Sequence, residues 1–230
     1  MTAALRLGLP AYGYPGTGLW ECLSASQSGA LIIMDPANGP GRSIDPRYSA
    51  AVATAMSDGL YVLGYVTTDY GHRSASEMSE EVERYREWYG VSGIFLDQTP
   101  ASVASSAAIA RAVTHIRASR LSLAINPGQP DIDPHDAVIA DHVVNFEGPC
   151  SSYRQCRFPD WVRDVARAKF WHLIYEVRDA PTMWEVAATA VGAHAGVAYI
   201  TDGTMPNPWE RLPVYWREEQ AMLAGGRPAP

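Results

Sequence analysis

Short apolar runs alternate with helical patterns along this 230-residue chain, and this alternation is the feature that constrains its fold most. Apolar runs that follow one another at roughly thirty residues or less, with a helix between them, are typical of parallel strands in α/β proteins. Eight runs can be recognised, near residues 5–9, 29–35, 61–67, 91–97, 121–126, 142–147, 170–175 and 196–201. Eight strand–helix units predict an α/β protein that closes as a single (β/α)8 TIM barrel.

The segments between the runs predict helices and leave no room for a second domain. Amphipathic patterns cover residues 75–89, 101–119 and 181–194, and a further one at 210–223 follows the last run. No linker rich in Pro, Gly or Ser interrupts the alternation. A hydrophobic content of 47% allows a chain of this length to bury one large core. We therefore expect one barrel domain over residues 1–230.

The charge of the chain argues against a nucleic-acid partner. Its formal net charge is -7, its pI is about 5.3, and Lys169 is its one lysine. The arginines are scattered, whereas phosphate-binding surfaces need clustered cations. No apolar run is long enough to span a membrane, and the first residues lack the charged and apolar regions of a signal peptide. We expect a cytoplasmic monomer, unless an export signal lies outside this sequence.

Cysteine and histidine spacing predicts no metal site. A zinc pattern needs paired elements such as CxxC or HExxH, but the six histidines occur singly, at positions 72, 115, 135, 142, 172 and 194. Cys22 falls in a predicted helix, whereas Cys150 and Cys156 bracket the loop CSSYRQC, which either closes as a disulfide or carries two free thiols. Lys169 precedes its strand, at the wrong end of a barrel for a Schiff base.

Polar side chains stand at the carboxyl ends of most predicted strands, which is the end of a barrel where active sites lie. The run at 91–97 ends in the sequence GIFLDQTP, where Asp97 closes an apolar strand and has no packing role. The other strand ends carry acids, amides and hydroxyl groups, namely Asp35, Asn38, Tyr65, Thr67, Asp69, Asn126, Glu147 and Asp202.

Alternation along the strands selects two of these acids. Asp97 shares its face with Phe95, and in the run two strands later Glu147 lies on the face opposite Val144 and Phe146. Both acids are therefore expected to point inward over the mouth of the barrel, from strands separated by only one other. Alternation predicts that they face each other.

Helix capping does not explain these two acids. The Thr-Pro pair at residues 99–100 is a better helix start than Asp97, because proline is favoured at the first helical position. Glu147 precedes Gly-Pro rather than a helical pattern. Asp35 and Asp202 each precede a turn-forming residue, so they either contact a ligand or bond their own backbone.

Aromatic residues crowd the same loops. Aromatic rings stack on the C–H faces of sugars, while neighbouring acids and amides bond the sugar hydroxyls, although Tyr65 and Trp216 equally suit the core. With no metal pattern, phosphate loop or Schiff-base lysine, paired carboxylates are the chemistry that the sequence supports. The aromatic residues concerned are Tyr12, Tyr14, Tyr65, Tyr70, Trp209, Tyr215 and Trp216.

Several motifs occur in order at the strand ends: DPANGPG, VLGYVTTDYGHR, RYREWYGVSGIFLDQ, AINPG, ADHVVNFEGP, AYITDG and NPWERLP. Together they make the chain resemble the spherulin 4 (spherulation-specific) family over nearly its whole length. The resemblance implies a (β/α)8 barrel. From fungal members it implies a glycoside hydrolase that cleaves α-1,4-linked galactosamine and N-acetylgalactosamine polymers such as galactosaminogalactan.

The resemblance also implies roles for residues. The family's strand-four Asp falls on Asp97, as nucleophile or cation-stabilising carboxylate, and its strand-six Glu falls on Glu147, as general acid/base of a retaining reaction. The family commonly has Asp-Glu where this chain has Asp97-Gln98, and alternation turns Gln98 away from Asp97 into a supporting role. Substrate contacts are expected from Tyr12, Asp35, Asn38, Tyr65, Thr67, Gln98, Asn126, Asp202 and Trp209.

Two other functions stay open: a sugar-binding barrel of the same family without catalysis, and an unrelated small-molecule enzyme, because fold does not fix function. No metal or organic cofactor is expected, since two carboxylates and water complete a glycoside hydrolysis. We expect a cationic substrate, such as a partly deacetylated amino-sugar polysaccharide, because acids collect at the predicted mouth without a lysine. These acids are Asp35, Asp69, Asp97, Glu147 and Asp202.

Overall fold

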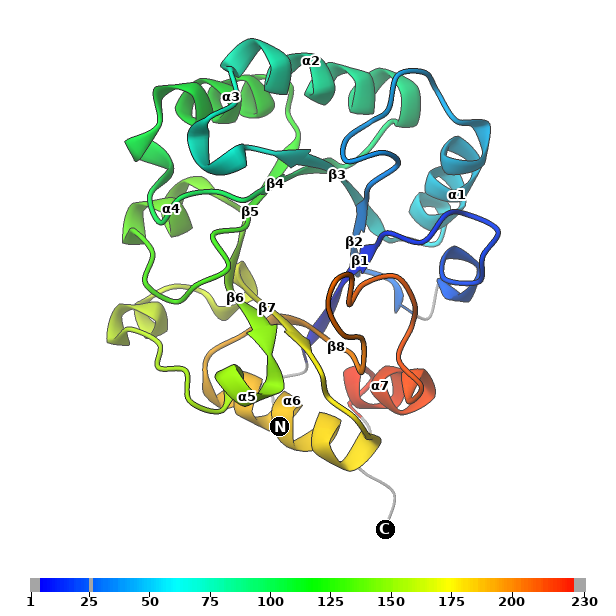
Figure 1. Ribbon diagram of the computed structural model, residues 1–230, viewed down its shortest axis with the longest axis vertical. Helices are drawn as coiled ribbons and strands as arrows, with labels where there is room; N and C mark the ends of the chain where they lie inside the picture. Colours follow the sequence, from blue (N-terminus) through cyan, green and yellow to red (C-terminus); the bar gives the residue numbers. More distant parts are fainter. Residues whose placement is uncertain (1–4, 25–26, 226–230) are drawn as a thin grey trace.

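The computed structural model of the protein describes residues 5–24 and 27–225. Eight parallel strands close into a barrel in which each strand pairs with the next along the chain and β8 pairs with β1 (Figure 1). The predicted (β/α)8 barrel is therefore confirmed. The strands are β1 (Arg6–Ala11), β2 (Leu31–Met34), β3 (Tyr61–Thr67), β4 (Gly93–Asp97), β5 (Ser122–Ile125), β6 (His142–Pro149), β7 (Phe170–Tyr175) and β8 (Val197–Ile200).

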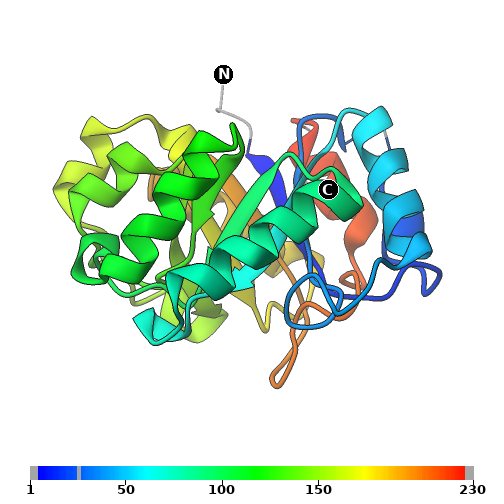
Figure 2. The same cartoon turned by 90° about the horizontal axis from the view of Figure 1, so that it is seen from above.

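Helices surround the barrel (Figures 1 and 2). They are α1 (Pro46–Ser57), α2 (Ala75–Arg84), α3 (Ala107–Ala118), α4 (Pro134–Ile139), α5 (Cys150–Tyr153), α6 (Ala180–Gly192) and α7 (Trp216–Leu223). A π-helical turn at Tyr85–Tyr89 extends α2, and 3₁₀ turns lie at Trp20–Cys22, Asp69–Gly71, Val103–Ser105, Asp160–Asp164 and Arg167–Lys169. Within residues 5–24 and 27–225, no helix combines the length and the apolar character needed to cross a membrane.

Two predicted helix starts are wrong. The helix expected from residue 101 begins at Ala107, because Thr99 still donates its backbone N–H to the carbonyl of Asn126 at the end of β5, and Ser106 supplies the helix cap. The helix expected from residue 210 begins only at Trp216. Proline at position 213 has no N–H to donate and disfavours helical backbone in the residue before it.

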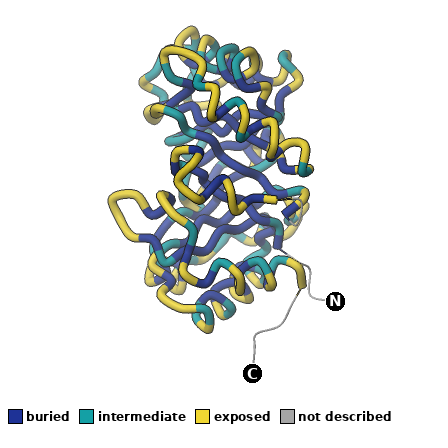
Figure 3. The backbone as a smooth tube through the Cα atoms, turned by 90° about the vertical axis from the view of Figure 1, so that its right-hand side faces the viewer, coloured by how far each residue is buried: buried dark blue, intermediate teal, exposed yellow. Residues whose placement is uncertain are grey.

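The centre of the barrel is filled by Trp171. Gly8 of β1 makes room for it, since a Cβ at Gly8 would lie 2.3 Å from the Trp171 ring. The indole nitrogen donates to the carbonyl of Gly8 over 3.2 Å, and Phe95 packs edge-to-face on the same ring with 5.7 Å between the centroids. Buried residues concentrate in the strands, and exposed residues lie on the outside of the molecule (Figure 3). Trp171 and Phe95 thus close the barrel interior.

A bulge in β6 interrupts the alternation. Val144 pairs with the inward-facing Trp171, but Phe146 pairs with His172, so one residue of β6 has no partner in β7. The prediction that Val144 and Phe146 share a face is therefore wrong, and Phe146 packs outside the barrel on Tyr153, 4.7 Å between centroids. Because Phe146 points outward after the bulge, alternation directs Glu147, the next residue of β6, inward.

Cys150 and Cys156 are free thiols in the structure, which decides between the two alternatives left open by the sequence. Cys150 begins α5 and is buried in an apolar cluster outside the barrel, and Cys156 is half-buried. Cys22 lies in the 3₁₀ turn after β1 and is exposed.

Candidate active site

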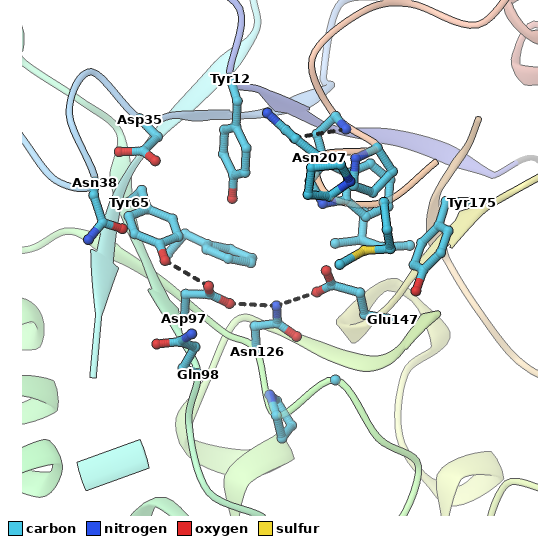
Figure 4. Close-up of a pocket in the computed structure, with 18 of the residues that line it drawn as sticks. Tyr12, Asp35, Asn38, Tyr65, Asp97, Gln98, Asn126, Glu147, Tyr175 and Asn207 are labelled. Carbon is cyan, nitrogen blue, oxygen red and sulfur yellow. Dashed lines mark hydrogen bonds between the residues drawn. The ribbon is translucent and has the colours of Figure 1, made fainter. Parts of the chain in front are cut away.

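A cavity of about 660 Å³ opens at the carboxyl ends of the strands. Every strand or the loop after it contributes a side chain to the wall, so residues far apart in the sequence meet there (Figure 4). In strand order they include Tyr12, Asp35, Tyr65, Asp97, Asn126, Glu147, Tyr175 and Trp209.

Asp97 and Glu147 lie in this cavity and are joined by Asn126 (Figure 4). The side-chain nitrogen of Asn126 donates to Oδ1 of Asp97 over 2.7 Å and to Oε2 of Glu147 over 2.6 Å. Two oxygens bonded to one nitrogen cannot be farther apart than the two bonds laid end to end. Their separation is therefore within about 5.5 Å, which is short of the roughly 6.5 Å at which a water molecule fits between two catalytic carboxyls.

Donors surround Asp97. The Tyr65 hydroxyl donates to Oδ2 over 2.8 Å, Asn126 donates to Oδ1, and the backbone N–H of Gln98 also bonds the carboxylate. Burial raises the pKa of Asp97 above its ordinary value, and these three hydrogen bonds act against that rise because they stabilise the ionised form.

Glu147 is placed to hold a proton. Burial and then the charge of Asp97 raise the pKa of Glu147 to about 7, while hydrogen bonds from Asn126 and Trp209 act in the opposite direction. Asp97 therefore ionises first and makes ionisation of Glu147 harder. Near neutral pH the pair can present one carboxylate and one protonated carboxyl group.

Asp35 bonds the backbone of its own loop and also lines the cavity. Its Oδ1 accepts the backbone N–H of Gly39 over 2.7 Å, which fixes the loop after β2, and it also lines the cavity beside Asn38. Burial raises the pKa of Asp35 to about 6, with a smaller contribution from the charge of Asp97. The Tyr12 hydroxyl faces these acids, and burial followed by their charges raises the pKa of Tyr12 well above its ordinary value. The hydroxyl group of Tyr12 therefore stays protonated and can donate a hydrogen bond.

Gln98 lines the cavity, which is the position that its predicted contact with substrate requires, but alternation is not a valid guide to its direction. The strand ends at Asp97, and Gln98 has a left-handed backbone with φ of 52°, so the strand pattern no longer sets its direction. Thr67 was expected to contact substrate but lies outside the cavity wall. Its hydroxyl donates to Oε1 of Gln98 over 2.7 Å and accepts the backbone N–H of Asp69 over 3.1 Å. Thr67 supports Gln98.

Asp202 does not line the cavity, which contradicts its predicted contact with substrate. Arg211 binds both of its carboxylate oxygens, over 2.9 and 3.1 Å, and so neutralises it. Asp69 also lies outside the wall, in the turn after β3. Three of the five acids expected at the mouth therefore line the cavity, and no Lys, Arg or His is among the described residues of its wall.

Several wall residues were missed. Tyr175 ends β7, where the strand-end rule applied to the other strands would have found it. The loop segment 205–208 lies beyond the end of β8, where no pattern in the sequence gives the direction of its side chains. Among the predicted aromatic residues, Tyr70 and Trp209 line the cavity, whereas Tyr14, Tyr215 and Trp216 do not. In the part of the chain that the structure describes, no three His, Cys, Asp or Glu side chains are grouped as metal ligands.

Solved structures share the fold. Aspergillus clavatus Sph3 in complex with GalNAc superposes with a TM-score of 0.80 at 21% identity, over 96% of this chain and 98% of that one. A fungal endo-β-N-acetylglucosaminidase from glycosyl hydrolase family 18 gives a TM-score of 0.57 at 13% identity, over 96% of this chain and 99% of the other. At sequence identities of 21% and 13%, these similarities establish only that the proteins share the barrel fold.

Sequence comparison identifies the family. Spherulin-4 of Physarum polycephalum is 28% identical over an alignment of 215 residues. The alignment covers 86% of this chain and 64% of that protein, so it spans less than two thirds of the relative's length. The model of the family described as spherulation-specific family 4 matches residues 6–223, which include all eight strands and the whole cavity wall. The chain belongs to this family, Spherulin4.

Proposed function

We propose that this protein hydrolyses glycosidic bonds in an α-1,4-linked polysaccharide of galactosamine and N-acetylgalactosamine, with Asp97 as nucleophile and Glu147 as general acid/base. The observation that carries this proposal is the pair of carboxyl groups bridged by the amide of Asn126. Glycoside hydrolysis needs one carboxyl group that holds a proton and one that stays ionised, in contact with opposite sides of the scissile bond.

The reaction would proceed in two steps. In the first, Oδ of Asp97 bonds to the anomeric carbon as its bond to the leaving oxygen breaks, and Glu147 gives its proton to that oxygen. In the second, Glu147 takes a proton from water, whose oxygen bonds to the anomeric carbon and releases Asp97. The enzyme returns to its starting protonation state, and no electrons are exchanged with a cofactor.

The environments of the two acids support this division of roles. Three donors favour the ionised form of Asp97, and burial beside that charge raises the pKa of Glu147 to about 7. Glu147 can therefore give a proton near neutral pH, which an ordinary glutamate could not. Their short separation supports retention, because retaining enzymes carry their carboxyl groups about 5–5.5 Å apart.

The composition of the cavity and its relatives support an amino-sugar substrate. The wall carries three carboxyl groups, Asp35, Asp97 and Glu147, and no cation among its described residues, so it suits a substrate with ammonium groups. The superposable Sph3 structure is a complex with GalNAc. Together these observations favour partly deacetylated galactosaminogalactan.

The direct test is release of reducing ends from purified galactosaminogalactan. The wild type should release them, and Asp97→Asn and Glu147→Gln should each lower the rate by at least about 100-fold, since the residues carry the chemistry. Asp69→Asn is the matched control, because it removes a strand-end acid outside the cavity and should leave the rate unchanged. A wild type that binds the polymer without releasing ends would contradict hydrolysis and favour a sugar-binding role.

A further inference from the structure

The cavity has two chemically different sides. On the side of Asp97, the wall offers a carboxylate, two amides and a hydroxyl group, from Asp35, Asn38, Gln98 and Tyr65 (Figure 4). These groups come from β2, β3, β4 and the loops that follow them. A sugar on this side would meet hydrogen-bonding groups on most of its hydroxyls.

The side of Glu147 is largely apolar and aromatic. Tyr175 and Asn207 lie there (Figure 4), and Trp209 packs on Tyr175 and donates a hydrogen bond to Glu147. Met205 and Pro206 precede Asn207 in the same loop and also line the cavity. Asn207 is a polar exception: its Oδ1 accepts the backbone N–H of Trp209 over 3.1 Å, and its amide nitrogen can still donate to a ligand. Apart from the amide of Asn207 and the hydroxyl group of Tyr175, these side chains would meet a ligand through carbon atoms.

Tyr175 is held from behind. Its ring packs edge-to-face on Trp209 with 5.9 Å between the centroids, and Trp209, only 5% exposed, packs in turn on the buried Tyr199. Tyr175 itself remains partly exposed to the cavity. An aromatic ring fixed in this way can stack on a flat apolar face without losing further side-chain freedom.

The proposed reaction determines which part of the substrate lies on each side of the cavity. The sugar that becomes bonded to Asp97 must lie on the side of Asp97. The leaving oxygen must lie within reach of the proton of Glu147, and the sugar unit that carries it therefore continues toward the side of Tyr175. This step rests on the proposed function.

We propose that Tyr175 is the stacking platform for the leaving-group sugar and so determines which glycosides are efficient substrates. A pyranose ring has a face of C–H groups that an aromatic ring covers well. Tyr175 then binds the polysaccharide on the far side of the scissile bond and contributes nothing to a substrate whose leaving group is not a sugar.

The experiment compares two substrates. One is the N-acetylated α-1,4 polymer, and the other is the α-fluoride of an N-acetylgalactosamine oligomer, whose small leaving group needs no platform. Tyr175→Ala should lower kcat/KM about tenfold or more on the polymer and less than about twofold on the fluoride. Tyr175→Phe, which keeps the ring, should recover most of the loss on the polymer.

Controls separate stacking from folding. Tyr61→Ala removes an exposed tyrosine at the start of β3, the opposite end of the barrel, and should change neither rate. If Tyr175→Ala does not fold, as judged by its melting temperature, Tyr175→Leu replaces it, since leucine keeps apolar bulk without a flat ring.

The outcomes are distinguishable. Equal losses on polymer and fluoride for a folded Tyr175 variant would overturn the platform and leave the proposed function standing. A wild type inactive on both substrates would instead contradict the proposed function. A selective loss on the polymer that phenylalanine reverses is the result that the platform requires.

Discussion

The carboxyl groups of Asp97 and Glu147 accept hydrogen bonds from the same amide nitrogen of Asn126. Two acids held so close cannot both ionise without repulsion, so the pair retains a proton to a higher pH than either acid would alone. The donors around Asp97 place the negative charge there, and the proton is left on Glu147. One geometric arrangement thus supplies both protonation states that a glycosidase needs.

The pH dependence of kcat/KM should be bell-shaped. Activity needs Asp97 ionised and Glu147 protonated. Activity should therefore rise with pH as Asp97 loses its proton, at a pKa above its ordinary value of about 4, and fall as Glu147 loses its proton near pH 7. Rates measured from about pH 4 to about pH 9 test this. A rate that stays constant through pH 7 to the alkaline end would contradict the role of Glu147.

Gln98→Glu should move this profile to higher pH. Gln98 is neutral and adjacent to Asp97, and its Oε1 is held by Thr67. A glutamate there would add a negative charge beside the pair and raise the pKa of both acids, because like charges disfavour ionisation. Both limbs of the profile should shift upward in the variant. Gln155→Glu, on the exposed loop after α5, is the matched control, and an identical shift in that variant would rule out a local effect.

Binding of a cationic polymer should depend on salt. The cavity carries Asp35, Asp97 and Glu147 without a neighbouring cation in its described wall, and such attraction is screened over about 10 Å at 0.1 M ionic strength. Added salt should therefore weaken binding of the deacetylated polymer much more than binding of its fully N-acetylated form. Titration of inactive Asp97→Asn with both polymers measures this. Equal salt dependence would remove the electrostatic basis of recognition.

Glu219 should make the protein less stable as the pH rises. It lies on α7 with 1% exposure, and its Oε1 accepts the backbone N–H of Ile200 over 3.0 Å. Burial raises the pKa of Glu219 to about 8 from an ordinary value of 4.5, so the folded protein binds a proton that the unfolded chain has lost. Its contribution to stability is therefore complete below about pH 4.5 and is lost as the pH rises toward about 8.

Urea unfolding at about pH 5 and about pH 8 tests this expectation. Glu219→Gln stays neutral, so the decrease in its free energy of unfolding between the two pH values should be smaller than in the wild type. Glu218→Gln, which changes the exposed neighbouring residue, should behave as the wild type does. If all three proteins lose the same stability, Glu219 is not the group that titrates.

The fold could be predicted because its signal repeats. Each strand is a short apolar run, and eight such runs separated by helices have few other arrangements. Local boundaries were less predictable, because long-range contacts set them. The backbone N–H of Thr99 bonds the carbonyl of Asn126 after β5 rather than starting a helix, and nothing near residue 99 in the sequence reveals that contact.

The candidate site could be predicted from the sequence where its side chains lie on regular strands. Alternation predicted that Asp97 and Glu147 face the same cavity, and the structure places both in its wall. The bulge in β6 turns Val144 inward but leaves the direction of Glu147 as predicted. Alternation does not extend to Gln98, because the strand ends at Asp97 and Gln98 has a left-handed backbone. The substrate contact expected for Asp202 rested on its position at a strand end, and the sequence did not reveal its partner Arg211, nine residues later on an irregular loop.

The anomeric form of the first product tests the central claim most directly. Proton NMR can follow the early hydrolysis of the α-1,4 polymer, before the released ends equilibrate between anomers. Two successive displacements at the anomeric carbon, the first by Asp97 and the second by water, should yield the α-anomer first, and Asp97→Asn should yield almost none. Initial appearance of the β-anomer would show a single displacement by water, which contradicts a covalent role for Asp97.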